Sequence, residues 1–149
     1  AGWMMGGGER KDKKFIQKII NQIKSGKKVL NIVDDKDGTP TYTHDFANNC
    51  KILIEGGHRG LFNMVSGGLT SRLEVANELI LQLRLEDEVT IKKVSSVFFK
   101  DEYFAERPAC ERLVNKRLDD LGINLMRHWK EALTEYLLNY YPEHLNVKL

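Results

Sequence analysis

The chain has 149 residues, of which 42% are hydrophobic and 30% are charged. This length suits a single domain with a real core, and the composition excludes a largely disordered chain. The formal net charge is only +2, which argues against nucleic-acid binding, because proteins of that class carry a concentrated basic surface.

Cysteine content and hydropathy indicate where the protein works. The two cysteines, Cys50 and Cys110, form no Cys-x-x-Cys pattern. So few cysteines argue against a disulfide framework and favour a reducing cytoplasm. No apolar run reaches the length of a bilayer crossing, so we expect no membrane association. The sequence opens on Ala1-Gly2-Trp3 without a methionine; a piece of a longer protein is one explanation, and a boundary chosen for expression is the alternative.

The first third of the chain alternates apolar runs with turn signals. Apolar residues from Phe15 to Ile23 recur at helical spacing. Asp12 fits the N-cap of this helix, and Gly26 fits the position after it. Three consecutive glycines, Gly6–Gly8, end the element before it. The expected order is a strand end at 1–5, a helix over 12–25, a strand at 29–33 and a turn-rich stretch over 34–42.

The clearest helix start lies at Ser71, where Ser71-x-x-Glu74 fits a capping box. The other expected elements are a helix over 43–55, a strand at 61–65, a strand at 89–94 and helices over 115–121 and 126–141. The helix over 43–55 is expected to turn Phe46, Ala47, Cys50 and Leu53 inward. This alternation of strands and helices predicts an α/β fold.

Several familiar catalytic and binding patterns are missing. Lys11 stands where Gly-x-Gly-x-x-Gly needs its last glycine, and no Gly-Lys-Ser/Thr follows to make a P-loop. The four histidines lack the i, i+4 spacing of a helical metal site. No serine lies in Gly-x-Ser-x-Gly. The residues therefore predict no metal site and no catalytic residue.

Five collinear segments form one pattern along the chain. The most specific is Val33–Ala47, V-D-D-K-D-G-T-P-T-Y-T-H-D-F-A, similar to V-x-D-Q-x-G-x-P-T-Y-x-x-D-L-A. The others are Gly2–Gly6, Gly60–Ser71, Arg107–Pro108 and Trp129–Leu133. Together they resemble the dTDP-4-dehydrorhamnose reductase family of extended short-chain dehydrogenase/reductases. Lys36 replaces that family's glutamine and Met5 its usual aromatic residue, so the sugar stays open.

The resemblance implies a two-part enzyme. In the family, an N-terminal Rossmann domain holds NAD(P)H, and a smaller C-terminal region binds a 4-keto nucleotide sugar that is reduced with the help of Tyr-x-x-x-Lys. No tyrosine here has a lysine four residues later. We therefore expect residues 1–149 to be the C-terminal part, with late strands of the Rossmann sheet and the small substrate-binding subdomain. We expect the NAD(P)-binding domain to be absent from residues 1–149 and the chain to have no cofactor of its own.

Three residues of the Val33–Ala47 segment, Gly38, Pro40 and Asp45, are expected to be structural. Gly38 supplies a positive φ in the turn. Asp45 lies in the first turn of the helix over 43–55, where negative charge is favoured. His44 precedes Asp45 directly, and adjacent helical residues point in different directions. A histidine–aspartate pair is therefore not expected.

Trp3 and Arg107 are the main candidates for substrate binding. The resemblance implies that Trp3 lies near the sugar, and an aromatic face suits the apolar side of a pyranose or stacks on a base. Ordinary packing at a strand end is the alternative. The guanidinium of Arg107 suits a pyrophosphate, which it grips as a bidentate fork. The alternative is an ion pair with Glu106 or Asp101.

Lys13 and Lys14 are candidates to assist phosphate binding, with plain surface exposure as the alternative. We expect the substrate-binding portion of an NAD(P)H-dependent reductase that makes a deoxysugar precursor for polysaccharide. The alternatives are a non-catalytic binding or regulatory module and a free-standing sugar-nucleotide binder. Expected partners are the nucleotide sugar, the missing Rossmann domain and further copies of the chain, which would associate through exposed apolar faces and strand edges.

Overall fold

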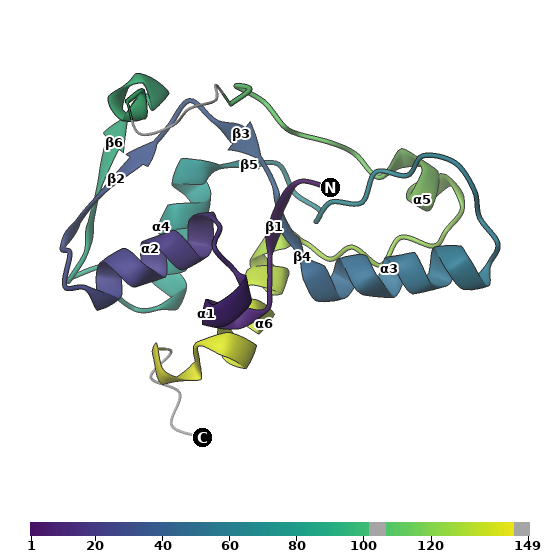
Figure 1. Cartoon of the computed structure of the whole chain (residues 1–149), viewed down its shortest axis with the longest axis horizontal. Coiled ribbons are helices and arrows are strands. Elements are labelled where there is room, and N and C mark those ends of the chain that lie inside the picture. Colours follow the sequence, from purple (N-terminus) through teal and green to yellow (C-terminus); the bar gives the residue numbers. More distant parts are fainter. Residues whose placement is uncertain (102–106, 145–149) are drawn as a thin grey trace.

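The computed structural model describes residues 1–101 and 107–144 of the chain (Figure 1). The elements in chain order are β1 (Trp3–Met5), α1 (Gly8–Lys11), α2 (Phe15–Lys24), β2 (Val29–Val33), β3 (Asp37–Gly38), β4 (Pro40–Tyr42), α3 (Thr43–Glu55), β5 (Thr70–Ser71), α4 (Arg72–Gln82), β6 (Thr90–Val94), η1 (Ser96–Phe99), α5 (Lys116–Asp120), α6 (Trp129–Tyr140) and η2 (Pro142–His144). In Figure 1 the β2–β6 pair and α3 lie at opposite ends of the molecule, with α4 and α6 between them.

The described strands form three two-stranded sheets. β1 runs parallel to β4 with Met4 opposite Thr41, and β2 runs parallel to β6 with Ile32 opposite Lys93. β3 and β5 form a short antiparallel pair. Parallel partners that are distant in sequence need crossover connections, and here those connections carry the helices. The expected α/β fold is confirmed, although the sequence did not predict β4, which lies in the stretch expected to be turn-rich.

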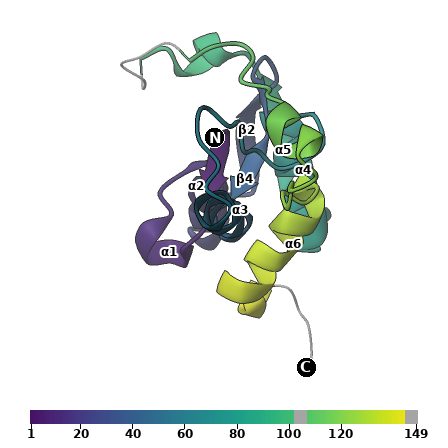
Figure 2. The same cartoon turned by 90° about the vertical axis from the view of Figure 1, so that its right-hand side faces the viewer.

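The main core lies where α2, α4 and α6 pack with β1, β2 and β4. Leu30 and Ile32 alternate inward along β2, as the period of a strand requires. Leu79 of α4 and Leu133 of α6 are fully buried. Figure 2 shows α6 passing beside α3 with its C-terminal end toward α1, and Gly8 of α1 lies against Tyr140.

The capping box expected at Ser71 is confirmed. The Ser71 hydroxyl accepts from the backbone N–H of Glu74 at 3.2 Å, and the Glu74 carboxylate accepts from the backbone N–H of Ser71 at 2.8 Å. The last helix begins at Trp129 and not at 126, since His128 occupies its N-cap and its ring nitrogen accepts from the Lys130 N–H. In the described residues, no helix is long and apolar enough to cross a bilayer.

Asp12 is not the N-cap of α2. The helix begins at Phe15 after Lys14, and Asp12 is buried. Its carboxylate accepts from the Lys14 backbone N–H and from the Tyr136 hydroxyl, each at 2.8 Å. The Tyr136 hydroxyl also contacts that of Tyr141, and burial raises the pKa of Tyr136 far above its usual range. The carboxylate therefore joins the start of the chain to α6.

The segment 61–65 is not a strand. Val65 donates its backbone N–H to Asn115 Oδ1 at 2.9 Å, and its carbonyl accepts from Asn115 Nδ2 at 2.7 Å. One buried side-chain amide thus satisfies both backbone groups that a neighbouring strand would otherwise have paired. The apolar residues of this segment do contribute to a core, because Met64 packs with Leu118 and Met126 in a second, smaller cluster.

Helix α3 has the expected bounds, but the face that it buries differs from the expected one. Ala47 is exposed, whereas Phe46, Cys50 and Leu53 are partly buried against the second cluster. The fully buried positions are polar: Asp45 and Asn49. Asn49 donates to the Ile123 carbonyl and accepts from the Leu125 N–H, each at 2.8 Å. Hydrogen bonding to a distant loop therefore orients this helix together with its apolar stripe.

Asp45 forms an ion pair with Arg127, with Nη2 and Oδ1 2.6 Å apart. Arg127 also pairs with Glu135 of α6 at 2.5 Å, so one guanidinium joins α3 to α6. Asp45 is therefore structural, as expected. His44 beside it bonds elsewhere, to the Tyr42 hydroxyl at 3.2 Å and the Tyr140 hydroxyl at 3.0 Å. The expected lack of a histidine–aspartate pair is confirmed.

We expect Arg127→Met to lower the free energy of unfolding by about 3–5 kcal/mol at neutral pH, because the buried Asp45 carboxylate loses its partner. The variant should also lose part of its acid sensitivity. Hydrogen bonding to Arg127 holds the pKa of Glu135 below its ordinary value of 4.5. The stability that Glu135 contributes is therefore present above that pH and is lost as the pH falls through the folded-state pKa. Urea denaturation from neutral to acid pH measures both effects.

Lys116→Met is the matched control for Arg127→Met. It removes the exposed ion pair between Lys116 and Asp120, whose atoms lie 2.9 Å apart. Solvent screens that pair, so its loss should cost less than about 1 kcal/mol. Equal losses in the two variants would contradict the structural role of the buried Asp45.

Candidate functional site

Trp3 is held in a fixed orientation at the start of β1. Its backbone N–H donates to the Thr39 carbonyl at 3.0 Å, and its indole Nε1–H donates to Glu111 Oε2 at 2.8 Å. Gly38 lies against the ring: a Cβ at that position would come within 2.3 Å of a ring atom. Gly38 does not adopt the expected positive φ. Glycine is needed there because the indole occupies the space.

A cation lies beside the indole. The guanidinium carbon of Arg72 is 5.0 Å from the centroid of the Trp3 ring and 5.1 Å from that of Phe15. Both distances are within cation–π range. We call this group, Trp3, Phe15, Gly38, Arg72 and Glu111, the Trp3 site. Sequence reasoning missed Arg72; the capping box located the start of α4, but nothing in the pattern connected that start with Trp3.

The segment that contains Arg107 runs alongside β3. The N–H of Asp37 donates to the Ala109 carbonyl at 2.8 Å, and the N–H of Glu111 donates to the Asp37 carbonyl at 2.9 Å. Arg112 pairs with Asp37 at 3.3 Å. This register brings Glu111 to Trp3. The Arg107 residue is exposed.

Arg107 is tied to the same region through its backbone. Its carbonyl accepts from Lys36 Nζ at 2.7 Å. The carbonyl of Lys36 in turn accepts from the backbone N–H of Arg72 at 3.1 Å. Asp101 forms no ion pair with Arg107 within the described residues, and Glu106 lies outside them. Arg107 thus stays a prediction as a ligand-binding residue.

Lys13 and Lys14 are both exposed and precede α2 directly. Phe15 follows them, and its ring contacts Arg72. The structure therefore brings the segments of all four predicted residues around Arg72. It does not join their side chains, because no hydrogen bond or ion pair connects Trp3, Lys13, Lys14 and Arg107 to one another among the residues described. Their roles stay predictions.

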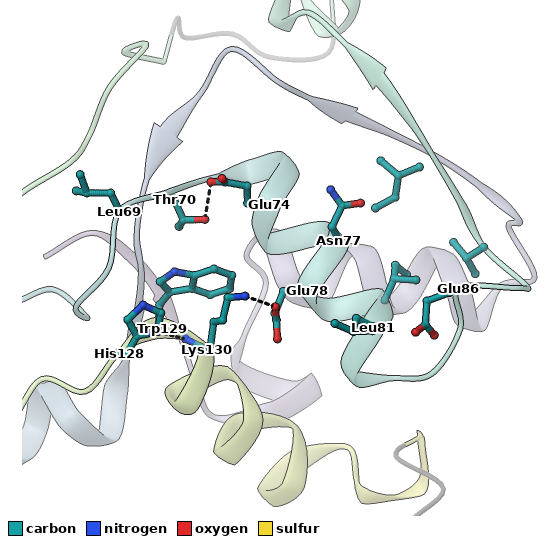
Figure 3. A pocket seen from close by; sticks show the side chains of 13 residues that line it. Leu69, Thr70, Glu74, Asn77, Glu78, Leu81, Glu86, His128, Trp129 and Lys130 are labelled. Atoms are coloured by element: carbon teal, nitrogen blue, oxygen red, sulfur yellow. Dashed lines mark hydrogen bonds and ion pairs between the residues drawn. The ribbon is translucent and has the colours of Figure 1, made fainter.

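A hollow of about 690 Å³ lies along the outer side of α4 (Figure 3). We call it the α4 groove. Its lining carries three carboxylates, from Glu74, Glu78 and Glu86, with Lys130 and His128 at one end, and it also includes apolar side chains such as Leu81 and Trp129. Lys130 pairs with Glu78 at 2.8 Å. Burial opposes ionisation of Glu78, but hydrogen bonds from Lys130 and Gln82 lower its pKa below the usual value. A diphosphate would be repelled here, so the Trp3 site is the better anion site.

The glycine run does not fit a dinucleotide. A Cβ at Gly6 would meet the Thr43 side chain at 1.9 Å, and one at Gly8 would meet the Tyr140 ring at 2.9 Å. These glycines allow the loop to pack against α3 and α6, and they leave no open cradle for phosphates. Within the parts of the chain that the structure describes, no group of three or more histidine, cysteine, aspartate or glutamate residues is placed to hold a metal ion.

The family model described as the RmlD substrate binding domain matches residues 1–141. The chain belongs to this family. It is 30% identical over 137 residues to the spore coat polysaccharide biosynthesis protein SpsK of Bacillus subtilis, covering 92% of this chain and 45% of that protein. It is 28% identical over 138 residues to the dTDP-4-dehydrorhamnose reductase of Mycobacterium tuberculosis H37Rv, covering 92% of this chain and 43% of that protein.

Solved structures show the same relationship for this member of the RmlD substrate binding domain family. The dTDP-4-dehydrorhamnose reductase of Yersinia enterocolitica superposes with a TM-score of 0.82 at 31% identity, covering 93% of this chain and 47% of that one. The Bacillus anthracis dTDP-4-dehydrorhamnose reductase, solved in complex with NADP, shares the fold with a TM-score of 0.81 at 23% identity, with coverages of 92% and 46%. The chain spans about half the length of these relatives, and the expected family and fold class are confirmed.

We expect Gly38→Ala to displace the indole of Trp3, because the added methyl would lie 2.3 Å from the ring. The fluorescence emission of Trp3, measured in a Trp129→Phe background so that Trp3 is the one tryptophan, should change. The free energy of unfolding should fall by about 1–3 kcal/mol. The control is Gly67→Ala, whose added Cβ meets its nearest atom at 3.7 Å, an ordinary contact. Unchanged emission in the Gly38 variant would show that the indole does not occupy this position.

Proposed function

We propose that this chain is the C-terminal, sugar-nucleotide-binding part of an NAD(P)H-dependent reductase that acts on a 4-keto nucleotide sugar in the cytoplasm. The observation that carries the proposal is the Trp3 site: an indole oriented by Glu111, with the guanidinium carbon of Arg72 5.0 Å from its centroid. An oriented aromatic face binds a sugar or a base, and a guanidinium binds a phosphate. The names of the relatives support the same class of ligand.

The proposal divides the reaction between two parts of the protein. Reduction adds a hydride from the reduced nicotinamide to the C4 carbonyl carbon and a proton to its oxygen, which leaves a secondary alcohol and the oxidised cofactor. The Rossmann domain that binds NAD(P)H and the Tyr-x-x-x-Lys proton donor belong to the other part in this proposal. The present chain binds and orients the nucleotide sugar through Trp3, with Arg107, Lys13 and Lys14 assisting at the diphosphate.

Binding of dTDP by this chain tests the assignment. Ligand-detected NMR should show saturation transfer to dTDP, and Trp3→Ala should weaken binding roughly tenfold or more, since stacking on an aromatic ring is worth about 1–3 kcal/mol. Trp3→Phe keeps an aromatic face and should retain most of the affinity. Lack of dTDP binding by the wild-type chain would contradict the proposal.

The non-catalytic alternative is separated by a second measurement. When this chain is produced together with the coding region that precedes it, oxidation of NADPH that depends on a 4-keto nucleotide sugar is expected. Binding of dTDP without that oxidation would favour a binding or regulatory module.

We also propose that the chain associates with other copies of itself through the outer side of α3. Ile54 is 79% exposed and Leu61 is 82% exposed, both near the end of that helix. Burying such side chains is favourable. Light scattering should therefore give a mass that rises with concentration, and Ile54→Lys with Leu61→Lys should hold the chain monomeric. Leu138→Lys, on α6, is the control and should leave association intact; a wild-type monomer at every concentration would refute the idea.

A further inference from the structure

Arg72 is held in place by its own helix and by a neighbouring strand. It is the first residue of α4 and directly follows Ser71, the N-cap of the capping box that fixes the start of that helix. Its backbone N–H donates to the Lys36 carbonyl at 3.1 Å, at the entrance to β3. The position of the Arg72 backbone is therefore determined before any ligand arrives, which reduces the entropy lost when its side chain binds one.

The guanidinium carbon of Arg72 is in cation–π range of two aromatic rings, with the centroid of Trp3 at 5.0 Å and that of Phe15 at 5.1 Å. Arginine differs from lysine in this respect: a guanidinium packs against aromatic rings and still offers in-plane N–H groups to an anion as a fork. The residue is only partly buried.

Three other cations lie in the same region, and each has contacts of its own or is exposed. Lys36 Nζ binds the Arg107 carbonyl, and Arg112 pairs with Asp37. The Arg107 residue is exposed and contacts the region through its backbone. Of these cations, Arg72 is the one in cation–π contact with the indole that the proposed function assigns to the nucleotide sugar.

We infer that Arg72 is a diphosphate-binding residue, which contacts the diphosphate of a nucleoside diphosphate sugar whose sugar or base lies on Trp3. This inference rests on the proposed function and adds to it a binding residue that sequence reasoning did not find. The α4 groove, on the outer face of the same helix, carries carboxylates and takes no part.

Two Arg72 variants and three probes test the inference. Arg72→Gln should weaken binding of dTDP and of inorganic pyrophosphate by roughly ten- to a hundredfold, the cost of a lost hydrogen bond to a charged group. Thymidine, which has no phosphate, should bind the variant as it binds the wild type. Arg72→Lys keeps the positive charge but loses the bidentate fork, so its affinity for dTDP and pyrophosphate should lie between those of the wild type and Arg72→Gln. Ligand-detected NMR on the whole chain gives all three affinities, and circular dichroism checks that each variant is folded.

Arg84→Gln is the matched control. It removes the same charge just beyond the other end of α4, where Arg84 is exposed, and should leave the affinity for dTDP unchanged. Equal dTDP affinity in wild type and Arg72→Gln would overturn the inference and leave the proposed function standing. Equal loss of thymidine and dTDP would also overturn it, because Arg72 would then act only by positioning Trp3. A wild-type chain that binds none of the three probes would overturn both.

Discussion

Parallel pairing of β1 with β4 determines the geometry of the Trp3 site. The register places Trp3 opposite Pro40 and Met5 opposite Tyr42. The indole therefore lies against Gly38, which is two residues before the start of β4. Strand β3, which contains Gly38, pairs at Asp37 with Cys110 and so places Glu111 next to the indole. A shift of one residue would turn Trp3 to the other face of the pair and remove it from both contacts. These short strands add few backbone hydrogen bonds, and their main contribution to the site is the register that they set.

Buried polar side chains hold the remaining segments in place. Asp12 joins the start of the chain to α6, Asn115 substitutes for a strand partner at Val65, and Asp45 ties α3 to Arg127. Each of these groups is satisfied within the described residues, as buried polar groups must be if they are not to destabilise the fold. Such contacts specify one arrangement more sharply than apolar packing, because a hydrogen bond has a direction as well as a distance.

Helix α4 borders two surfaces of different charge: the Trp3 site has one guanidinium and one carboxylate, and the α4 groove has three carboxylates and one lysine. Its first residue, Arg72, faces the aromatic rings of the Trp3 site, whereas Glu74 and Glu78 line the α4 groove on its outer side. The α4 groove is therefore not the surface suited to an anionic ligand. The charges that line them, and not the presence of a hollow, distinguish the two surfaces.

The sequence by itself determined the elements with strong local signals. Helix α3 and strand β2 have the expected bounds, the capping box at Ser71 formed as predicted, and the collinear motifs identified the family. Local energetics suffices in these cases, because caps, helical periodicity and glycine stops act within a few residues. The motif that contains Trp3 also pointed to a residue that the structure places beside a cation.

Only the tertiary structure decided the rest. Arg72 meets Trp3 across 69 positions of sequence, Asn115 replaces a strand at Val65, and Gly38 is required by an indole and not by its own φ. The end of the turn-rich stretch, Pro40–Tyr42, forms the strand β4 because it pairs with β1. Each depends on a partner that is remote in the chain, and a pattern of neighbouring residues contains no information about which distant group will occupy the space beside it.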